Sequence, residues 1–133
     1  MRDTLSLSQL RFLDHNLRVK LNRFGVHSLW QLVEHGLTAR ERRLLARRLG
    51  VEEGNVLKLV RLADMCRLCD IELAELLIEA GVNTPLELPY RSLSELCAMV
   101  SDAAQRFGFS PPARSELEEL RKKARTLPPL FDY

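Results

Sequence analysis

The chain has 133 residues, 46% hydrophobic and 29% charged, which is enough for one buried core and too little for two ordinary domains. Its formal net charge of +2 argues against a strongly basic protein that coats nucleic acid with its whole surface. Because it has neither a long apolar run nor a signal-peptide core, we expect a cytoplasmic protein with no membrane partner, and three cysteines make no disulfide framework.

The first fifty residues predict four short helices. Leucine recurs at helical spacing, and alternating runs of β-branched or aromatic residues are missing, which favours an all-α fold. The expected helices cover residues 7–13, 17–24, 29–35 and 39–49. The expected N-caps of the last three are Asn16, Ser28 and Thr38, the last forming a capping box with Glu41. Gly25 and Gly50 are expected to be left-handed C-terminal stops.

The rest of the chain predicts longer helices and an extended tail. The expected helices cover residues 53–68, 71–80, a short segment that begins at 84–85, 93–106 and 114–126. These elements predict a compact single-domain bundle of about seven to eight short helices. Two prolines exclude a helix over residues 127–133, so this tail is expected to pack as a strap. The alternative is that its apolar side chains form an exposed partner motif.

One pattern occurs twice, at an offset of 56 residues. Its first copy is Gly25, Val26, Ser28 and Leu32, and its second copy is Gly81, Val82, Thr84 and Leu88. Upstream of it, Leu17 and Leu21 match Leu73 and Leu77. A helix pair closed by such a cap cannot bury its apolar face alone, whereas two copies packed together can. The pattern therefore favours pseudo-repeat units at about 7–50 and 56–108, followed by a C-terminal helix and tail over 113–133; the alternative is chance recurrence.

These residues carry a resemblance to a known family. The chain resembles the helix-hairpin-helix superfamily, and within it the DUF4332 family, over roughly residues 8–127. The best-matching stretches are residues 37–51, 56–68 and 74–88. The resemblance implies two degenerate hairpin units. In the superfamily, two glycines flank an apolar residue in the hairpin, so that backbone N–H groups at a helix start grip a phosphate.

The hairpin positions of this chain depart from that pattern. In the first unit they hold Asp14, His15 and Asn16, and in the second they hold Asp70, Ile71 and Glu72. A carboxylate repels a phosphate, and a residue with a Cβ resists the close approach that glycine allows. The departure puts phosphate binding by these loops in doubt.

The sequence supports no catalytic, metal or cofactor site. Cys66 and Cys69 form one C-x-x-C, but a structural zinc site needs four ligands, and Cys97 has no neighbouring His or Cys. The histidines, which lie among expected loops and helix ends without an adjacent nucleophile, are His15, His27 and His35. One helix face carries an acidic row, which consists of Glu72, Glu75 and Glu79. This row is either a solvated face or a docking patch for a basic partner. We therefore expect a protein that is not an enzyme.

Charge is divided between the two halves of the chain. Residues 1–67 carry a net charge of +6 and residues 68–133 carry −4. The candidate nucleic-acid-binding residues are Arg18, Lys20, Arg40, Arg43, Arg47, Lys58 and Arg61. Arg40, Arg43 and Arg47 share one helix face and are placed to follow a phosphate backbone. The alternative is a solvated helix whose arginines pair with Glu41, Glu52 and Glu53.

Two functions remain open at this level. The first is a non-catalytic module whose basic first half binds the DNA or RNA backbone without reading sequence. The second is a protein-interaction or self-assembly adaptor that has abandoned the phosphate-gripping hairpins, so that a protein partner or a homo-oligomer uses the opposite charges of the two halves. Phe24 and Trp30 occupy apolar helix positions and are expected to anchor the core.

Overall fold

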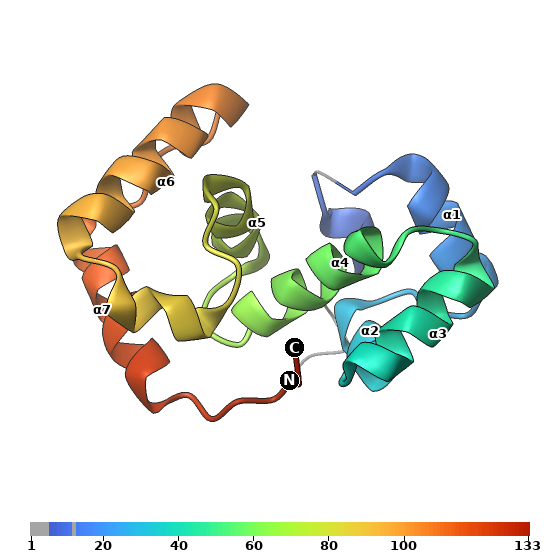
Figure 1. Ribbon diagram of the computed structural model, residues 1–133. Coiled ribbons are helices and arrows are strands. Elements are labelled where there is room, and N and C mark those ends of the chain that lie inside the picture. Colours follow the sequence, from blue (N-terminus) through green and yellow to red (C-terminus); the bar gives the residue numbers. More distant parts are fainter. Residues whose placement is uncertain (1–5, 12) are drawn as a thin grey trace.

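The computed structural model describes residues 6–11 and 13–133 and shows a compact all-α fold (Figure 1). The first half holds η1 (Leu7–Gln9), α1 (His15–Arg23), α2 (Leu29–Glu34) and α3 (Ala39–Leu49). The second half holds α4 (Glu53–Met65), α5 (Ile71–Ala80), η2 (Pro85–Tyr90), α6 (Leu93–Phe107) and α7 (Arg114–Thr126). The described residues contain no named strand, and Ser6 and Ser28 form an isolated antiparallel bridge.

Helix α4 is the central element. It runs between α1, α2 and α3 on one side and α5, α6 and α7 on the other (Figure 1), and it packs on α2, α3 and α5. Val56, Val60 and Met65 are fully buried in α4. Gly36 allows this packing, since a Cβ placed there would lie 2.7 Å from the Val60 Cγ2 atom. Both halves therefore share one core, built on α4.

Several helix boundaries differ from the prediction. The helix predicted over residues 7–13 is the three-residue 3-10 turn η1, while its position 12 lies outside the described residues. Asp14, not Asn16, caps α1, because the Asp14 carboxylate reaches the Leu17 N–H at 3.1 Å. Helix α4 ends at Met65, before the predicted residue 68, because the chain turns there through i to i+3 hydrogen bonds toward α5.

The glycine and valine of the recurring sequence pattern have the same backbone geometry in both copies, although the first copy continues into the α-helix α2 and the second into the 3-10 helix η2. Gly25 and Gly81 are left-handed, with φ of +91° and +101°. The next residues, Val26 and Val82, are buried, and each donates its N–H at 2.9 Å to the carbonyl five residues before it. Helices α3 and α6 each open on a hydroxyl N-cap and end at a left-handed glycine, Gly50 or Gly108. Both copies of the pattern therefore close a helix with the same left-handed cap.

The tail after α7 is extended and crosses the molecule. Its Phe131 side chain is buried, and the Asp132 N–H donates to the Leu37 carbonyl at 2.8 Å. Tyr133 donates its hydroxyl to the buried Asp64 carboxylate at 2.9 Å. Leu130 stays partly exposed. The strap formed by residues 127–133 thus joins the end of α7 to α4 and to the loop before α3.

Candidate nucleic-acid interface

Helix α3 separates an apolar face from a basic face. Leu45, Ala46 and Leu49 are buried at helical spacing, and they hold α3 against the core. The residues exposed on the opposite side are Arg40, Arg43, Leu44, Arg47 and Arg48. Because α3 rises about 1.5 Å per residue, the Cα atoms of Arg40 and Arg47 lie about 10 Å apart along the axis. That distance equals about three base steps of duplex DNA.

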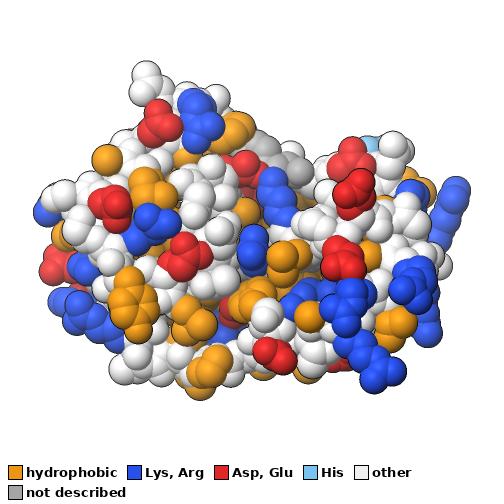
Figure 2. Space-filling model, viewed as in Figure 1, with side chains coloured by type: hydrophobic (Ala, Val, Ile, Leu, Met, Phe, Trp, Pro, Cys, Tyr) orange, Lys and Arg blue, Asp and Glu red, His pale blue; other side chains and the backbone are white. Residues whose placement is uncertain are grey.

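Helix α1 extends this surface. Lys20 and Arg23 are exposed on the last turns of α1, and the Lys20 Nζ donates to the Gly50 carbonyl at the end of α3, at 3.4 Å. We define the basic face as Lys20, Arg23, Arg40, Arg43, Arg47 and Arg48. In Figure 2, Lys and Arg side chains gather over the part of the molecule that holds α1 and α3 in Figure 1.

No carboxylate of the described residues forms an ion pair with the basic face. Glu41, the predicted partner on α3, instead accepts the Thr38 hydroxyl at 3.1 Å as part of the capping box. Glu52 and Glu53 are exposed beyond the end of α3 and also make no ion pair with it. The basic face therefore presents positive charge that no described carboxylate pairs with.

The other predicted binding residues lie elsewhere. Lys58 on α4 is paired with Glu79 of α5 at 2.8 Å. Arg18 donates to the Leu10 carbonyl at 3.4 Å, and its Nε is buried without an acceptor. Arg61 lines a separate hollow with Tyr133, and its Nε is likewise buried without an acceptor. The structure thus brings Lys20, Arg40, Arg43 and Arg47 together and leaves Arg18, Lys58 and Arg61 outside the basic face. The candidate set predicted from the sequence omitted Arg23 of α1 and Arg48 of α3, although both are among the basic residues of the first half.

Arg42 stands within the arginine run but has a structural role. Its side chain is 5% exposed. The guanidinium donates to the Gly36 carbonyl at 2.8 Å and to the Asp132 carbonyl at 2.6 Å, and it lies 5.4 Å from the centre of the Tyr133 ring. Arg42 therefore fastens the strap to the start of α3 and adds nothing to the exposed charge.

In each of the two hairpin loops, an aspartate carboxylate caps the helix that follows. Asp14 caps α1 through the Leu17 N–H at 3.1 Å, and Asp70 caps α5 through the Leu73 N–H at 2.9 Å. The remaining hairpin residues, exposed except for the half-buried Ile71, are His15, Asn16, Ile71 and Glu72. A helix N-terminus whose donors already face a carboxylate has less to offer a phosphate. The loops are thus poorly suited to a phosphate grip.

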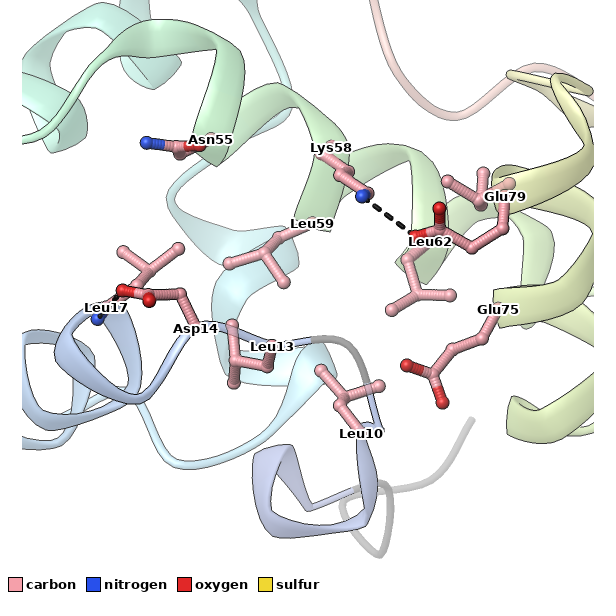
Figure 3. A pocket seen from close by; sticks show the side chains of 11 residues that line it. Leu10, Leu13, Asp14, Leu17, Asn55, Lys58, Leu59, Leu62, Glu75 and Glu79 are labelled. Atoms are coloured by element: carbon pink, nitrogen blue, oxygen red, sulfur yellow. Dashed lines mark hydrogen bonds and ion pairs between the residues drawn. The ribbon is translucent and has the colours of Figure 1, made fainter. Parts of the chain in front are cut away.

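A crevice beside the first hairpin is acidic (Figure 3). It measures about 120 Å³ and is walled by leucines of the hairpin and of α4. Asp14, Glu75 and Glu79 line it together with Lys58, which pairs with Glu79. Both Glu75 oxygens accept the Arg11 N–H, at 3.1 and 2.9 Å. Three carboxylates against one paired lysine make this crevice unfavourable for a phosphate group.

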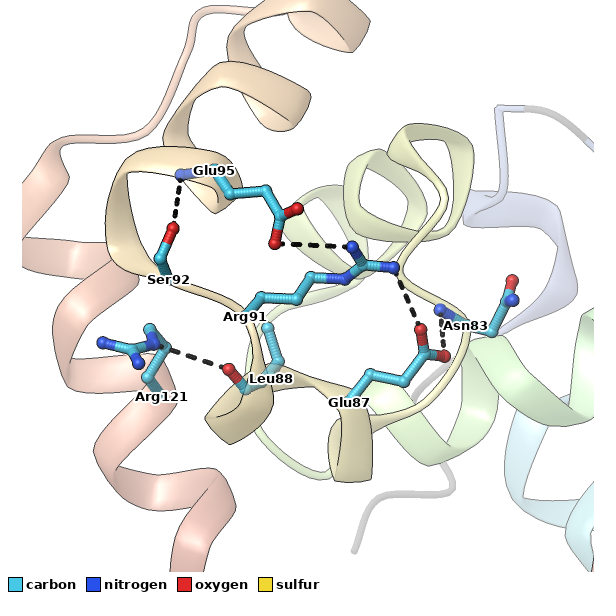
Figure 4. A network of polar contacts seen from close by, with 7 residues as sticks. All are labelled: Asn83, Glu87, Leu88, Arg91, Ser92, Glu95 and Arg121. Atoms are coloured by element: carbon cyan, nitrogen blue, oxygen red, sulfur yellow. Dashed lines mark hydrogen bonds and ion pairs between the residues drawn. The ribbon is translucent and has the colours of Figure 1, made fainter.

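In the second half of the chain, many cationic side chains pair with carboxylates or donate to a backbone carbonyl (Figure 4). Arg91 lies between Glu87, at 3.3 Å, and Glu95, at 3.7 Å. Arg121 donates its Nε to the Leu88 carbonyl at 3.4 Å. Arg106 pairs with Asp102 and Lys122 with Glu119. The uneven charge of the sequence therefore appears as a basic face on the first half, while several cations of the second half pair with its own carboxylates.

The described residues hold no group of three or more His, Cys, Asp or Glu side chains arranged for a metal ion. Burial, then the nearby Glu75 and Asp70 charges, raise the pKa of Cys66 to about 12. Burial chiefly raises the pKa of Cys69 still further, and its thiol donates to the Met65 carbonyl at 3.6 Å. Both thiols are therefore protonated near neutral pH, so neither is activated as a nucleophile.

Comparison with known protein families places most of the chain in one of them. The family model of DUF4332, described as a domain of unknown function, matches residues 13–127. Among curated proteins and among solved structures, nothing matches the chain. Within the described residues, no helix has the length and apolar character that crossing a membrane requires.

Proposed function

The chain belongs to the DUF4332 family, and we propose that it is a non-catalytic module that binds the phosphate backbone of DNA or RNA through the basic face without reading sequence. The observation that carries the proposal is the set of six exposed cations on α1 and α3 that make no ion pair with any residue the structure describes. Cations of this kind displace the counterions condensed on a nucleic acid, which drives binding without base contacts.

We further propose that the fold is a degenerate pair of helix-hairpin-helix units whose binding surface has moved. The recurring left-handed caps at Gly25 and Gly81 support the paired units. The carboxylate caps at Asp14 and Asp70 oppose phosphate binding at the hairpins. In this proposal, α3 takes over the contact that the hairpin glycines make in the wider superfamily.

Fluorescence anisotropy across salt concentrations tests the proposed function. With a labelled duplex and a labelled single strand, affinity should fall as salt rises from about 50 to 200 mM. Replacing Arg43 and Arg47 by Gln should reduce the slope of log affinity against log salt by about two for the duplex, because each lost phosphate contact removes about 0.9.

A matched variant controls for net charge. Lys123 and Arg125 are exposed on α7, and the Lys123→Gln, Arg125→Gln variant loses the same charge from the other half of the molecule. This control should keep most of the wild-type slope. The proposal is wrong if the wild type shows no binding at low salt, or if the two double variants weaken binding equally.

The second candidate is self-association through opposite charges, favoured by the acidic second half. Exposed carboxylates at Glu116, Glu118 and Glu119 begin α7, and the basic face lies on the first half. Contact between unlike surfaces of two copies would be head-to-tail and weakened by salt. Light scattering that finds a salt-sensitive oligomer, lost in the Arg43→Gln, Arg47→Gln variant, would favour this candidate, and a strict monomer would oppose it.

A further inference from the structure

A small hollow opens beside the basic face, and Arg48 belongs to both. It lies where the ends of α1 and α2 meet α3, and it measures about 150 Å³. Its lining consists of Phe24, His35, Glu41, Leu44, Leu45 and Arg48. A cavity of about 150 Å³ accommodates a benzene ring. One six-membered aromatic ring therefore matches the size of this hollow.

The walls are suited to the face and edge of such a ring. Phe24 and His35 meet edge-to-face, with ring centroids 5.5 Å apart and an interplanar angle of 67°, and both are half-buried. Leu44 is 41% exposed although it is a large apolar side chain. Aromatic side chains are the platforms on which proteins stack unpaired bases. The hollow thus offers apolar area that the chain itself leaves uncovered.

Polar groups at the hollow match the edge of a base. Among the described residues, the His35 ring packs edge-to-face with Phe24 and makes no hydrogen bond, which leaves a ring nitrogen for a ligand. Glu41 contributes carboxylate oxygens, one of which already accepts the Thr38 hydroxyl. Arg48 borders the hollow and belongs to the basic face. An aromatic ring that carries hydrogen-bonding atoms and is joined to a phosphate satisfies all three side chains at once.

We propose that this hollow takes one unpaired base of a single-stranded nucleic acid whose phosphates lie on the basic face. The inference rests on the proposed function and narrows its ligand class from any nucleic acid to single strands. In a duplex, each base is stacked and paired, so its ring cannot enter the hollow without an unstacking cost. Arg48 at the hollow, with the other five cations of the basic face on α1 and α3, favours a phosphate polymer over an aromatic side chain of a protein.

The test compares three labelled probes of equal length by fluorescence anisotropy at one low salt concentration. They are an oligothymidylate, a strand with the same phosphates but abasic sugars, and a duplex. The oligothymidylate should bind on the order of tenfold tighter than the abasic strand, because stacking one base on a protein contributes that order of affinity. It should also bind tighter than the duplex.

Two variants locate the base. Leu44→Ser and His35→Ala each remove one wall, and both should lower oligothymidylate affinity toward that of the abasic strand while leaving abasic binding unchanged. Leu130→Ser is the matched control, because Leu130 is also a partly exposed leucine, 39% exposed, on the strap and outside the lining of the hollow. Circular dichroism of each variant shows whether it keeps its helices. If one of the two variants has lost them, the other variant alone tests whether the base occupies the hollow.

The outcomes separate the two proposals. Equal affinity for oligothymidylate and abasic strand, both sensitive to salt, overturns the base site and leaves backbone binding intact. A duplex that binds tighter than both strands also overturns it. No binding to any probe removes the proposed function and this inference together. The hollow belongs to a protein partner under a different outcome. In that outcome an acidic peptide with one phenylalanine binds the wild type but not the Leu44→Ser variant, and the oligothymidylate binds no tighter than the abasic strand.

Discussion

Two adjacent arginines on α3 have opposite roles. Arg42 is buried and donates to two backbone carbonyls, whereas Arg43 is exposed and makes no ion pair among the described residues. The difference comes from helical geometry, because a step of one residue turns the side chain through 100°. Treating the arginine run as one charged cluster therefore overstates the exposed charge and misses a structural residue.

We predict that Arg42→Leu lowers the free energy of unfolding by about 3 kcal/mol, because hydrogen bonds from a charged donor contribute about 1.5–3 kcal/mol and both acceptors would lose their partner. Arg43→Leu should change it by less than about 0.5 kcal/mol, as is usual at exposed positions. Urea denaturation followed by circular dichroism measures both. Equal stabilities of the two variants would contradict the structural role of Arg42.

The two half-buried thiols make a second prediction at this scale. Because burial raises the pKa of Cys66 to about 12 and that of Cys69 further, both stay protonated at pH 8. We expect each to react with a disulfide reagent at least about tenfold more slowly in the folded protein than in guanidinium. Mass spectrometry of peptides at timed intervals assigns the rates. Rapid labelling of either thiol in the folded state would show that it is activated.

At the scale of the element, caps and prolines explain which helices the sequence could predict. The bounds of α3, α5 and α7 were predicted correctly. Helices α3 and α5 each carry a polar N-cap and a left-handed glycine stop, whereas α7 has neither and is bounded by the prolines before and after it. The segments η1 and η2 form 3-10 helices instead of α-helices. Pro89 lies inside η2, where a proline cannot donate the hydrogen bond that an α-helix needs. A helix boundary was therefore predictable where the sequence supplies both a side-chain N-cap and a left-handed glycine at the C-terminus, or where prolines flank the helix.

We predict that Gly25→Ala and Gly81→Ala each reduce stability by about 1 kcal/mol, since an L-residue resists positive φ. A Cβ at Gly25 would have no heavy atom within 4 Å, so the cost there is conformational and not steric. Gly54 on α4 is also open and makes a control, because Gly54→Ala should hold or raise stability. Thermal unfolding measures all three. A stable Gly25→Ala protein would argue against the left-handed cap.

At the scale of the whole molecule, the sequence indicated the sign of the net charge of each half, but not which charged side chains share a surface. The all-α fold and the family membership were confirmed, and both depend on local patterns. Lys58 could not be excluded from the site by sequence, because its partner Glu79 lies on the next helix. The hollow could not be foreseen either, since Phe24, His35 and Leu44 come from three helices that meet only in the fold.

The strap closes the molecule by joining its last residues to the core. Tyr133 donates to the buried Asp64, which also pairs with Arg67 at 2.8 Å, and Arg67 in turn donates to the Pro128 carbonyl. This arrangement ties the strap to α4 at two places. Burial of the phenol, then the charge of Asp64 and the hydrogen bond to it, raise the pKa of Tyr133 above its ordinary value.

The raised pKa predicts that the strap loosens at high pH. A group whose pKa is higher in the folded state stabilises the fold fully below its ordinary value, about 10 for tyrosine, and this stabilisation is lost as pH rises toward the folded value. We therefore expect the free energy of unfolding to fall more steeply above about pH 10 in the wild type than in Tyr133→Phe, which has no phenol to ionise. Urea denaturation at a series of pH values measures both proteins, and their difference removes the shared effect of lysine titration. Parallel curves would mean that the Tyr133 hydroxyl does not hold the strap.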